Sequence, residues 1–201
     1  MCNTPIAPDS AHSHYRLYKP FGMLSQLSSN DPVQLRKKRF LSALFDFPPN
    51  SMPIGRLDEK SEGLLLVTTD GKLSDTINRS GIEKEYYAQV DGPITDEALN
   101  QMRKGIEIGL FGKKHITRPC AITRIEAPHL PEASPKLRIG AHRPSSWISI
   151  TLTEGKFRQV RKMTAAVGFP TLRLVRIRVG TIVLEGLQPG QVEKLQGFNV
   201  K

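Results

Sequence analysis

Hydrophobic and polar residues alternate in different ways along the chain, and each pattern predicts an element. The continuous apolar run at 63–68 ends in Asp70 and Gly71, as expected for a buried strand followed by a turn. In ISITLT, within 146–153, apolar and polar residues alternate, which predicts a strand with one buried face. The segment EKEYYAQV, at 83–90, is rich in aromatic and β-favouring residues and predicts another strand.

Strands are also predicted near both ends of the sequence and in its middle. Tyr15 begins a short strand that leads into a Pro-Phe-Gly turn and a second extended piece. A further strand is predicted at 115–126. The closing run TLRLVRIRVGTIVLEGL, from Thr171, alternates apolar and β-branched residues with arginines, which favours extended structure.

Three segments show helical spacing instead. Residues 72–79 follow the Asp-Gly turn, and Thr95 can cap a helix over 96–104 that stops at Gly105. The third segment, KFRQVRKMTAAVG, is predicted to be a helix that stops at Gly168. Its apolar stripe consists of Phe157, Val160, Thr164 and Val167. Its basic residues, on more exposed faces, are Arg158, Arg161 and Lys162.

These elements together predict an α+β fold. Strands and helices mix without a regular βαβ rhythm, so we expect a mixed, largely antiparallel sheet flanked by helices. Residues 127–146 are basic and rich in proline, as expected for an exposed loop, and 31–53 is a second basic stretch interrupted by prolines. Residues 1–14 lack periodicity and are expected to form a flexible leader, so that 15–201 make up a single domain.

The formal charge of +10 favours a polyanion as the partner of the protein, because a surplus of positive charge of that size concentrates polyanions around it. Nucleic acid is the leading candidate, and a charge that serves only solubility is the alternative. Cys2 and Cys120 suggest neither a disulfide framework nor a thiolate metal site, which fits a reducing compartment. The sequence shows no signal peptide and no membrane-spanning stretch, so we expect a cytoplasmic protein without a membrane partner.

Asp58 is the first candidate for chemistry. An aspartate beside charged residues is usually a solvated turn residue. Here, however, Arg56, Asp58 and Glu59 lie between Ile54 and the predicted buried strand, where a carboxylate would be partly desolvated and would need a cationic partner to stay ionised. An ionised and positioned carboxylate is a usable nucleophile.

Several motifs, in order along the chain, resemble the RNA pseudouridine synthases that act on the small and large ribosomal subunits. The first is Gly55-Arg56-Leu57-Asp58, followed by Ser61-Glu62-Gly63-Leu64-Leu65-Leu66 and then Thr68, Asp70 and Gly71. The second is Lys84-Glu85-Tyr86. The third is the basic segment from Glu154 to Met163, and the fourth combines Leu174, Arg176 and Val179-Gly180.

The resemblance implies a cofactor-free conversion of uridine to pseudouridine in ribosomal RNA, with Asp58 as the nucleophile on a flipped-out uridine. Tyr86 matches the tyrosine that lies against the target base, and Tyr87 would then face the opposite way as a core residue. Arg161 matches the arginine that pairs with the nucleophile. No metal is implied, and no metal-ligand spacing links the histidines.

The resemblance also implies contacts with RNA around the reacting base. Arg56 would help hold the space left by the flipped nucleotide, and Leu174 would pack beneath the base. Phosphate contacts are expected from the basic residues Lys19, Lys84, Lys156, Arg158 and Arg176. Glu59, Lys60 and Glu62 are expected to be solvated bystanders.

Some features depart from the family pattern. Phe157-Arg158 replaces a Tyr-His pair that is common in this branch, and Thr69 replaces an Asn. The family's Lys-Pro-x-Gly turn falls at Lys19 to Gly22, which leaves no room for the separate N-terminal RNA-binding module of many relatives. We therefore expect a stand-alone catalytic domain with two lobes and a central RNA-binding cleft.

The resemblance points to 23S rRNA, free or in a pre-ribosomal particle, as the partner, and to a monomeric enzyme. Two other functions stay open at this point. One is a non-catalytic RNA-binding or ribosome-assembly protein that retains the fold. The other, an aspartate-dependent nucleoside hydrolase, is disfavoured because no second carboxylate is evidently placed as an acid/base partner.

Overall fold

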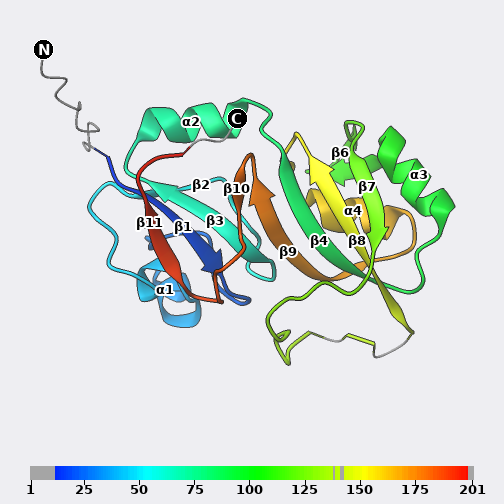
Figure 1. Cartoon of the computed structure of the whole chain (residues 1–201), viewed down its shortest axis with the longest axis horizontal. Coiled ribbons are helices and arrows are strands. Elements are labelled where there is room, and N and C mark those ends of the chain that lie inside the picture. Colours follow the sequence, from blue (N-terminus) through cyan, green and yellow to red (C-terminus); the bar gives the residue numbers. More distant parts are fainter. Residues whose placement is uncertain (1–11, 138, 141–142, 199–201) are drawn as a thin grey trace, which may run out of the picture.

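The computed structural model of the chain describes residues 12–137, 139–140 and 143–198. Within this part of the chain, nine strands form one mixed sheet (Figure 1). Its main path has the order β11-β1-β3-β9-β4-β8-β7. These strands are β1 (His14–Lys19), β3 (Glu62–Thr68), β4 (Lys84–Asp91), β7 (Ala121–Ile125), β8 (Ser145–Leu152), β9 (Thr171–Val179) and β11 (Val192–Leu195). The short strands β2 (Met52–Ile54) and β10 (Ile182–Val183) pair with β3 and β9.

A two-stranded hairpin and four α-helices complete the described elements. The hairpin consists of β5 (Glu107–Leu110) and β6 (Lys113–Ile116). The helices are α1 (Pro32–Lys37), α2 (Gly71–Arg79), α3 (Asp96–Lys104) and α4 (Gln159–Ala166), and a 3₁₀ turn covers Leu41–Ala43. The longest of these helices has nine residues, far below the length needed to cross a membrane.

The sheet is antiparallel except at its centre. There, β3 and β9 pair in parallel through Glu62 with Val175 and Gly63 with Arg176. Gly63 has φ +102°, and a Cβ atom on it would lie 2.3 Å from the carbonyl oxygen of Arg176. Only glycine therefore allows the two strands to approach so closely.

Three clusters of buried apolar side chains make up the core. The largest lies between β4, β8 and the helices α3 and α4, and it includes Tyr86, Ile148 and Met163. A second joins β3 and β9 to α2. A third lies under β1 and includes Met23 and Leu41. The second cluster runs across the junction of β3 and β9, so apolar packing is continuous from one side of the junction to the other.

Most of the predicted elements are confirmed. Asp70 caps α2 by accepting hydrogen bonds from two backbone amides, and Thr95 caps α3 in the same way through one. The buried strand at 63–68 is β3, which is buried at every position. The α+β class and the mixed, largely antiparallel sheet are also confirmed.

Four predictions need correction. The strand at 115–126 is two strands, because the chain leaves β6 at Ile116 and enters β7 only at Ala121. The helix predicted from Lys156 begins at Gln159, since Arg158 takes a left-handed conformation with φ +53°. Phe157 consequently lies before the helix and is exposed rather than part of its buried stripe. The basic stretch 31–53 contains α1 and β2, which the sequence pattern did not indicate.

The ends of the chain were also only partly predicted. Residues 1–11 of the expected leader lie outside the described residues. His14, at the end of that leader, is already the first residue of β1. The strand β11 was not predicted from the sequence, and it pairs with β1 at the edge of the sheet.

Candidate active site

Asp58 lies in the loop between β2 and β3, and neighbouring groups hold the backbone of this loop. Ser25 accepts a hydrogen bond from the Leu57 amide and donates one to the Leu57 carbonyl, both at 2.9 Å. The Ser61 amide donates to the Asp58 carbonyl at 2.9 Å. The Leu57 side chain is buried in the core cluster of β4 and α4. The backbone at Asp58 is therefore fixed on both sides.

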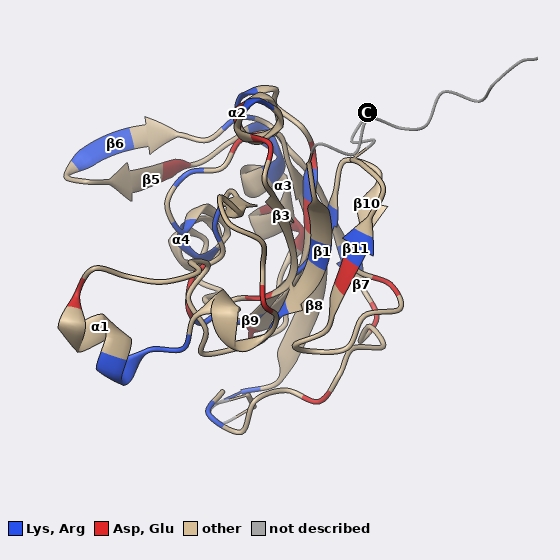
Figure 2. Cartoon of the chain, turned by 90° about the vertical axis from the view of Figure 1, so that its left-hand side faces the viewer, with Lys and Arg blue, Asp and Glu red and all other residues tan. Residues whose placement is uncertain are grey.

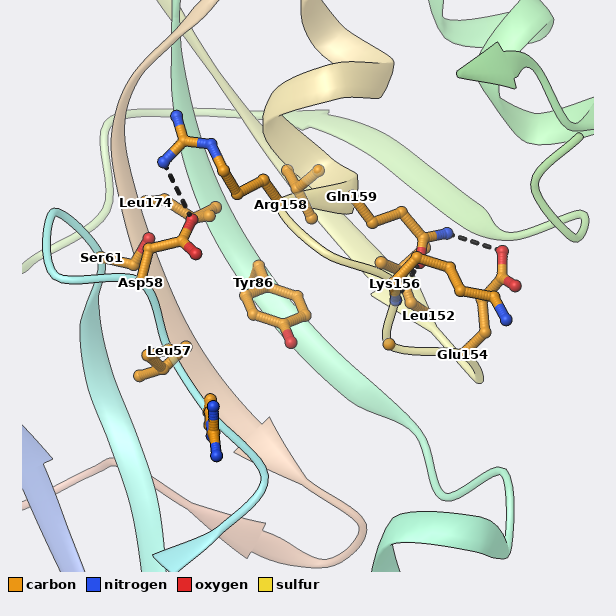
Figure 3. Close-up of a pocket in the computed structure, with 13 residues that line it drawn as sticks. Leu57, Asp58, Ser61, Tyr86, Leu152, Glu154, Lys156, Arg158, Gln159 and Leu174 are labelled. Carbon is orange, nitrogen blue, oxygen red and sulfur yellow. Dashed lines mark hydrogen bonds and ion pairs between the residues drawn. The ribbon is translucent and has the colours of Figure 1, made fainter. Parts of the chain in front are cut away.

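Two arginines from the α4 region face the Asp58 carboxylate. Its Oδ2 atom lies 3.5 Å from Nη1 of Arg158 and 3.7 Å from Nε of Arg161, and 23% of the Asp58 side chain is exposed. Figure 3 shows Arg158 reaching across the pocket toward Asp58. At these distances both guanidinium groups attract the carboxylate electrostatically. The partly desolvated aspartate with a cationic partner, expected from the sequence, is present.

Arg161 is buried more deeply than Arg158, since only 11% of the Arg161 side chain is exposed. Its guanidinium donates to the carbonyls of Lys60 at 2.7 Å and Thr171 at 3.2 Å, and to the hydroxyl of Ser61 at 3.3 Å. Burial, and then repulsion from Arg158, lower its pKa, while Asp58 and Glu62 act in the opposite direction. These contacts join α4 to the Asp58 loop and orient Nε toward the carboxylate.

Tyr86 and Leu174 form part of the cavity wall beside Asp58. Both side chains are almost fully buried, and both line the cavity that contains the Asp58 carboxylate (Figure 3). They come from β4 and β9, at the centre of the sheet. Tyr87, the next residue of β4, lines a different cavity on the opposite face, as alternation along a strand requires, and it is only partly buried there instead of being the expected core residue. The structure thus brings Tyr86, and not Tyr87, to the site.

The candidate RNA-binding residues divide between this cavity and an adjoining one. Arg158 and Leu174 line the cavity of Asp58, whereas Arg56 and Lys156 line both. The adjoining cavity also contains Lys84, Arg176, Arg79 and Arg118. The two cavities share Tyr86, so the basic groups lie next to the candidate nucleophile.

Arg176, which is buried, and Lys84, which is half-buried, both line the adjoining cavity. The Nε atom of Arg176 donates to the Leu64 carbonyl at 2.7 Å, whereas no hydrogen-bond partner for its buried Nη2 atom is found among the described residues. Lys84 donates to the Ile82 carbonyl, and burial followed by repulsion from Arg176 lowers its pKa. Two poorly compensated cations in one cavity favour an anionic ligand.

Lys19 is a correction to the predicted RNA contacts. It is 0% exposed, and its ammonium donates to the carbonyls of Met23 at 2.7 Å and Pro20 at 3.0 Å. A side chain enclosed in this way cannot reach a phosphate on the surface. Lys19 instead holds the turn that follows β1.

Glu62 is also not the solvated bystander expected from the sequence. It is buried and pairs with Arg173 at 2.8 Å, and Arg173 donates further to the Pro131 carbonyl at 2.9 Å. Glu59 differs, since it is partly exposed and pairs with Lys38 at 2.8 Å. Glu62 and Arg173 therefore form a buried ion pair between β3 and β9, directly beneath the Asp58 loop.

Glu154 is a carboxylate in the Asp58 cavity that sequence reasoning missed. It accepts hydrogen bonds from the Arg118 amide at 2.8 Å and from the Gln159 side chain at 2.7 Å, with His115 at 3.4 Å. Burial would raise its pKa, but these donors lower it on balance. A carboxylate kept ionised in this way is poorly suited to be the proton donor that a nucleoside hydrolase needs.

No group of three or more His, Cys, Asp or Glu side chains that could hold a metal ion is found in the part of the chain that the structure describes. The side chains at the site combine a carboxylate, two arginines, a phenol and an apolar wall.

The comparisons with known proteins agree on one family. A family model described as "RNA pseudouridylate synthase" matches residues 13–166. The chain is 42% identical to ribosomal large subunit pseudouridine synthase E of Vibrio parahaemolyticus over 182 residues, covering 89% of this chain and 71% of the relative. It is also 42% identical to the protein of that name from Xanthomonas campestris pv. campestris over 178 residues, covering 87% and 91%. A crystal structure titled as a pseudouridylate synthase superposes with a TM-score of 0.72 and 26% identity, covering 92% of this chain and 70% of that one.

Proposed function

The chain belongs to the RNA pseudouridylate synthase family, and from this premise we propose that it isomerises uridine to pseudouridine in 23S ribosomal RNA with Asp58 as the nucleophile. In this reaction the bond between ribose and N1 of uracil breaks, and a bond between the same ribose carbon and C5 forms. N1 gains a proton and C5 loses one. The observation that carries the proposal is the Asp58 carboxylate facing two arginines in a cavity walled by Tyr86 and Leu174.

The Asp58 carboxylate attacks either the uracil ring or the ribose, so that the base can detach, turn and rejoin through carbon. Arg161 fixes the direction of the carboxylate through the attraction between the two groups. Its backbone contacts support this role, because they hold the guanidinium independently of the aspartate. Arg158 is more exposed and has fewer contacts, so it is free to follow the substrate.

The target base lies against Tyr86 with Leu174 packed below it. The phenol stacks on the ring and is within the cavity where the C5 proton must be removed. Arg56 is exposed and lines the Asp58 cavity, the adjoining cavity and a third cavity that includes Ser25 and Asn78, which fits a side chain that fills the space left by the flipped nucleotide. The RNA follows this line of cavities as its binding cleft.

Phosphate groups next to the target contact the basic residues of the adjoining cavity. Lys156 and Arg158 are exposed and meet the backbone at the rim. Lys84 lies deeper in the same cavity, where it can meet a phosphate oxygen. Arg176 also lines this cavity, but it is almost fully buried and its unpaired Nη2 atom is closed to solvent, so it attracts the RNA through its charge and not through a direct contact.

Replacement of Asp58 tests the proposal directly. We expect Asp58→Ala to lose all tritium release from [5-³H]uridine-labelled 23S rRNA while it keeps the fold and most of the RNA affinity, because the change removes the nucleophile and no phosphate contact. The matched control is Glu59→Ala, since Glu59 is a neighbouring carboxylate that pairs with Lys38 outside the cavity. The control should keep its turnover.

The same assay separates the alternatives. Full turnover by Asp58→Ala would exclude the nucleophile assignment. RNA binding without tritium release by the unmodified protein would indicate a non-catalytic assembly protein, and free uracil as a product would indicate a hydrolase. Mapping pseudouridines in 23S rRNA with and without the gene, followed by restoration with purified protein, tests the choice of RNA and identifies the target nucleotide.

A further inference from the structure

The β5–β6 hairpin carries an exposed aromatic ring at its tip. Figure 2 shows the hairpin projecting away from the sheet on the side where α4 lies. Phe111, in its turn, is 84% exposed, and Ile116 on β6 is 72% exposed. Phe157, in the segment before α4, is 53% exposed. The exposed rings of Phe111 and Phe157 indicate a contact surface, whereas Ile116 pairs with Glu107 at the other end of the hairpin from the turn.

The backbone of Phe111 is unusual for an aromatic residue. Leu110 pairs with Lys113, so Phe111 and Gly112 are the two central residues of the hairpin turn, with φ +49° and +79°. Such turns favour Asn-Gly or Asp-Gly, because both central residues need positive φ. A bulky residue in this conformation is strained, and strain of this kind concentrates at functional positions. Turn formation alone thus gives no reason for a phenylalanine here.

Phe111 and Phe157 form a stacked pair, which we call the aromatic platform. Their ring centroids are 5.5 Å apart and their planes differ by 28°. The ammonium of Lys162 lies 5.2 Å from the centre of the Phe157 ring and also donates a hydrogen bond to the Gly109 carbonyl. These contacts hold the hairpin against α4 and keep the platform rigid.

Basic residues surround the aromatic platform. Lys113 and Lys114 follow Phe111 in the hairpin, and both are exposed. Lys156 and Arg158, on either side of Phe157, line the cavity that contains Asp58. Rigid aromatic faces set among cations are the usual means of binding an unpaired nucleic acid strand, in which bases stack on the rings and phosphates meet the charges.

We propose that the aromatic platform of Phe111 and Phe157 stacks an unpaired nucleobase that flanks the target uridine. The proposal rests on the proposed function, since it places a second nucleotide of the same RNA. The charges favour a nucleobase over a protein partner, because a surface that binds an apolar protein patch is depleted of lysine at its centre.

Substitutions at Phe111 test the platform. We expect Phe111→Ala to raise the KM for 23S rRNA about tenfold with little change in kcat, because stacking supports binding and not the chemical step. Phe111→Leu should behave like the alanine variant, since it keeps the apolar volume without the ring. Phe111→Trp should have the KM of the unmodified protein. The fluorescence of the added tryptophan should be quenched when a short oligouridylate binds. Thermal unfolding verifies that each variant is folded.

Ile116→Ala is the matched control, because Ile116 is a large exposed apolar residue on the same hairpin that has no aromatic ring. Its KM should equal that of the unmodified protein. A normal KM in Phe111→Ala or Phe111→Leu would overturn the proposal, as would equal losses in the Phe111 and Ile116 variants, which would indicate a general apolar docking surface. An unmodified protein that forms no pseudouridine would instead overturn the proposed function, and the quenching measurement would still report on the platform.

Discussion

Burial decides what each basic residue near Asp58 can do. Arg161 and Lys19 are enclosed and hold backbone carbonyls, whereas Arg158 and Lys156 are exposed and open to a ligand. Spacing along the chain does not reveal this difference. Arg161 could be identified from its place in the basic motif. Its role as a link between α4 and the Asp58 loop could not, because it depends on the carbonyls of two residues distant in the sequence. Lys60 is 101 residues away from Arg161, and Thr171 is 10 residues away.

Lys19 gives the stability of the protein a predictable dependence on pH. Burial lowers its pKa from 10.5 to about 7, although Glu62, Glu59 and Asp58 act in the opposite direction. Between these two values the unfolded chain binds a proton at Lys19 that the folded chain lacks. Raising the pH through this window therefore stabilises the folded state, by up to about 1.4 kcal/mol per pH unit.

We expect the stability difference between the unmodified protein and Lys19→Met to change with pH in that direction. The unmodified protein should gain relative to the variant as the pH rises from 7 toward 10, measured by urea unfolding at each pH. Taking the difference cancels the other titrating groups. A difference that stays constant over this range would show that Lys19 is charged in the folded protein.

At the level of elements, the prediction succeeded where local signals are strong. The Thr95 cap, the Asp-Gly turn before α2 and the apolar run of β3 identified their elements directly. The prediction failed where tertiary contacts determine the secondary structure. The hairpin of β5 and β6 has a Phe-Gly turn that carries no hairpin signal, and β11 is a short polar strand that depends on pairing with β1.

In the candidate site, too, some residues could be predicted from local sequence signals and others could not. Asp58, Tyr86 and Arg161 could be predicted because the family motifs contain them, whereas the supporting groups could not. Ser25 lies 32 residues from Leu57, and Arg173 lies 111 residues from Glu62. No local pattern connects residues so far apart, so these contacts appear only in the folded chain.

The junction of β3 and β9 gives a prediction at the level of elements. Gly63→Ala should destabilise the protein by roughly 3 kcal/mol, because the new Cβ atom would collide with the Arg176 backbone at a positive φ. Chemical unfolding measures the loss. The control is Gly197→Ala, where a Cβ atom meets nothing within 4 Å. A stability of Gly63→Ala equal to that of the control would show that the two strands can separate at little cost.

For the whole molecule, the charge of +10 has a measurable consequence. RNA affinity should fall steeply as salt rises, and each phosphate contact that is removed should lower the slope of log K against log salt by about 0.7. Lys156→Met removes a cation at the rim of the Asp58 cavity, so its slope should be shallower. Lys194→Met, on β11 at the far edge of the sheet, removes the same charge without a change in slope. Equal slopes in both variants would mean that Lys156 contacts no phosphate.

The long-range pairing of β3 with β9 also sets the order in which the molecule can be assembled during synthesis. β1 and β2 can each pair with β3 as soon as these strands leave the ribosome, so the Asp58 loop between β2 and β3 can form early. The partners of that loop, Arg161 on α4 and Leu174 on β9, are added more than 100 residues later. A nascent chain therefore carries the Asp58 carboxylate for more than 100 residues of elongation before the groups that face it in the folded protein are synthesised.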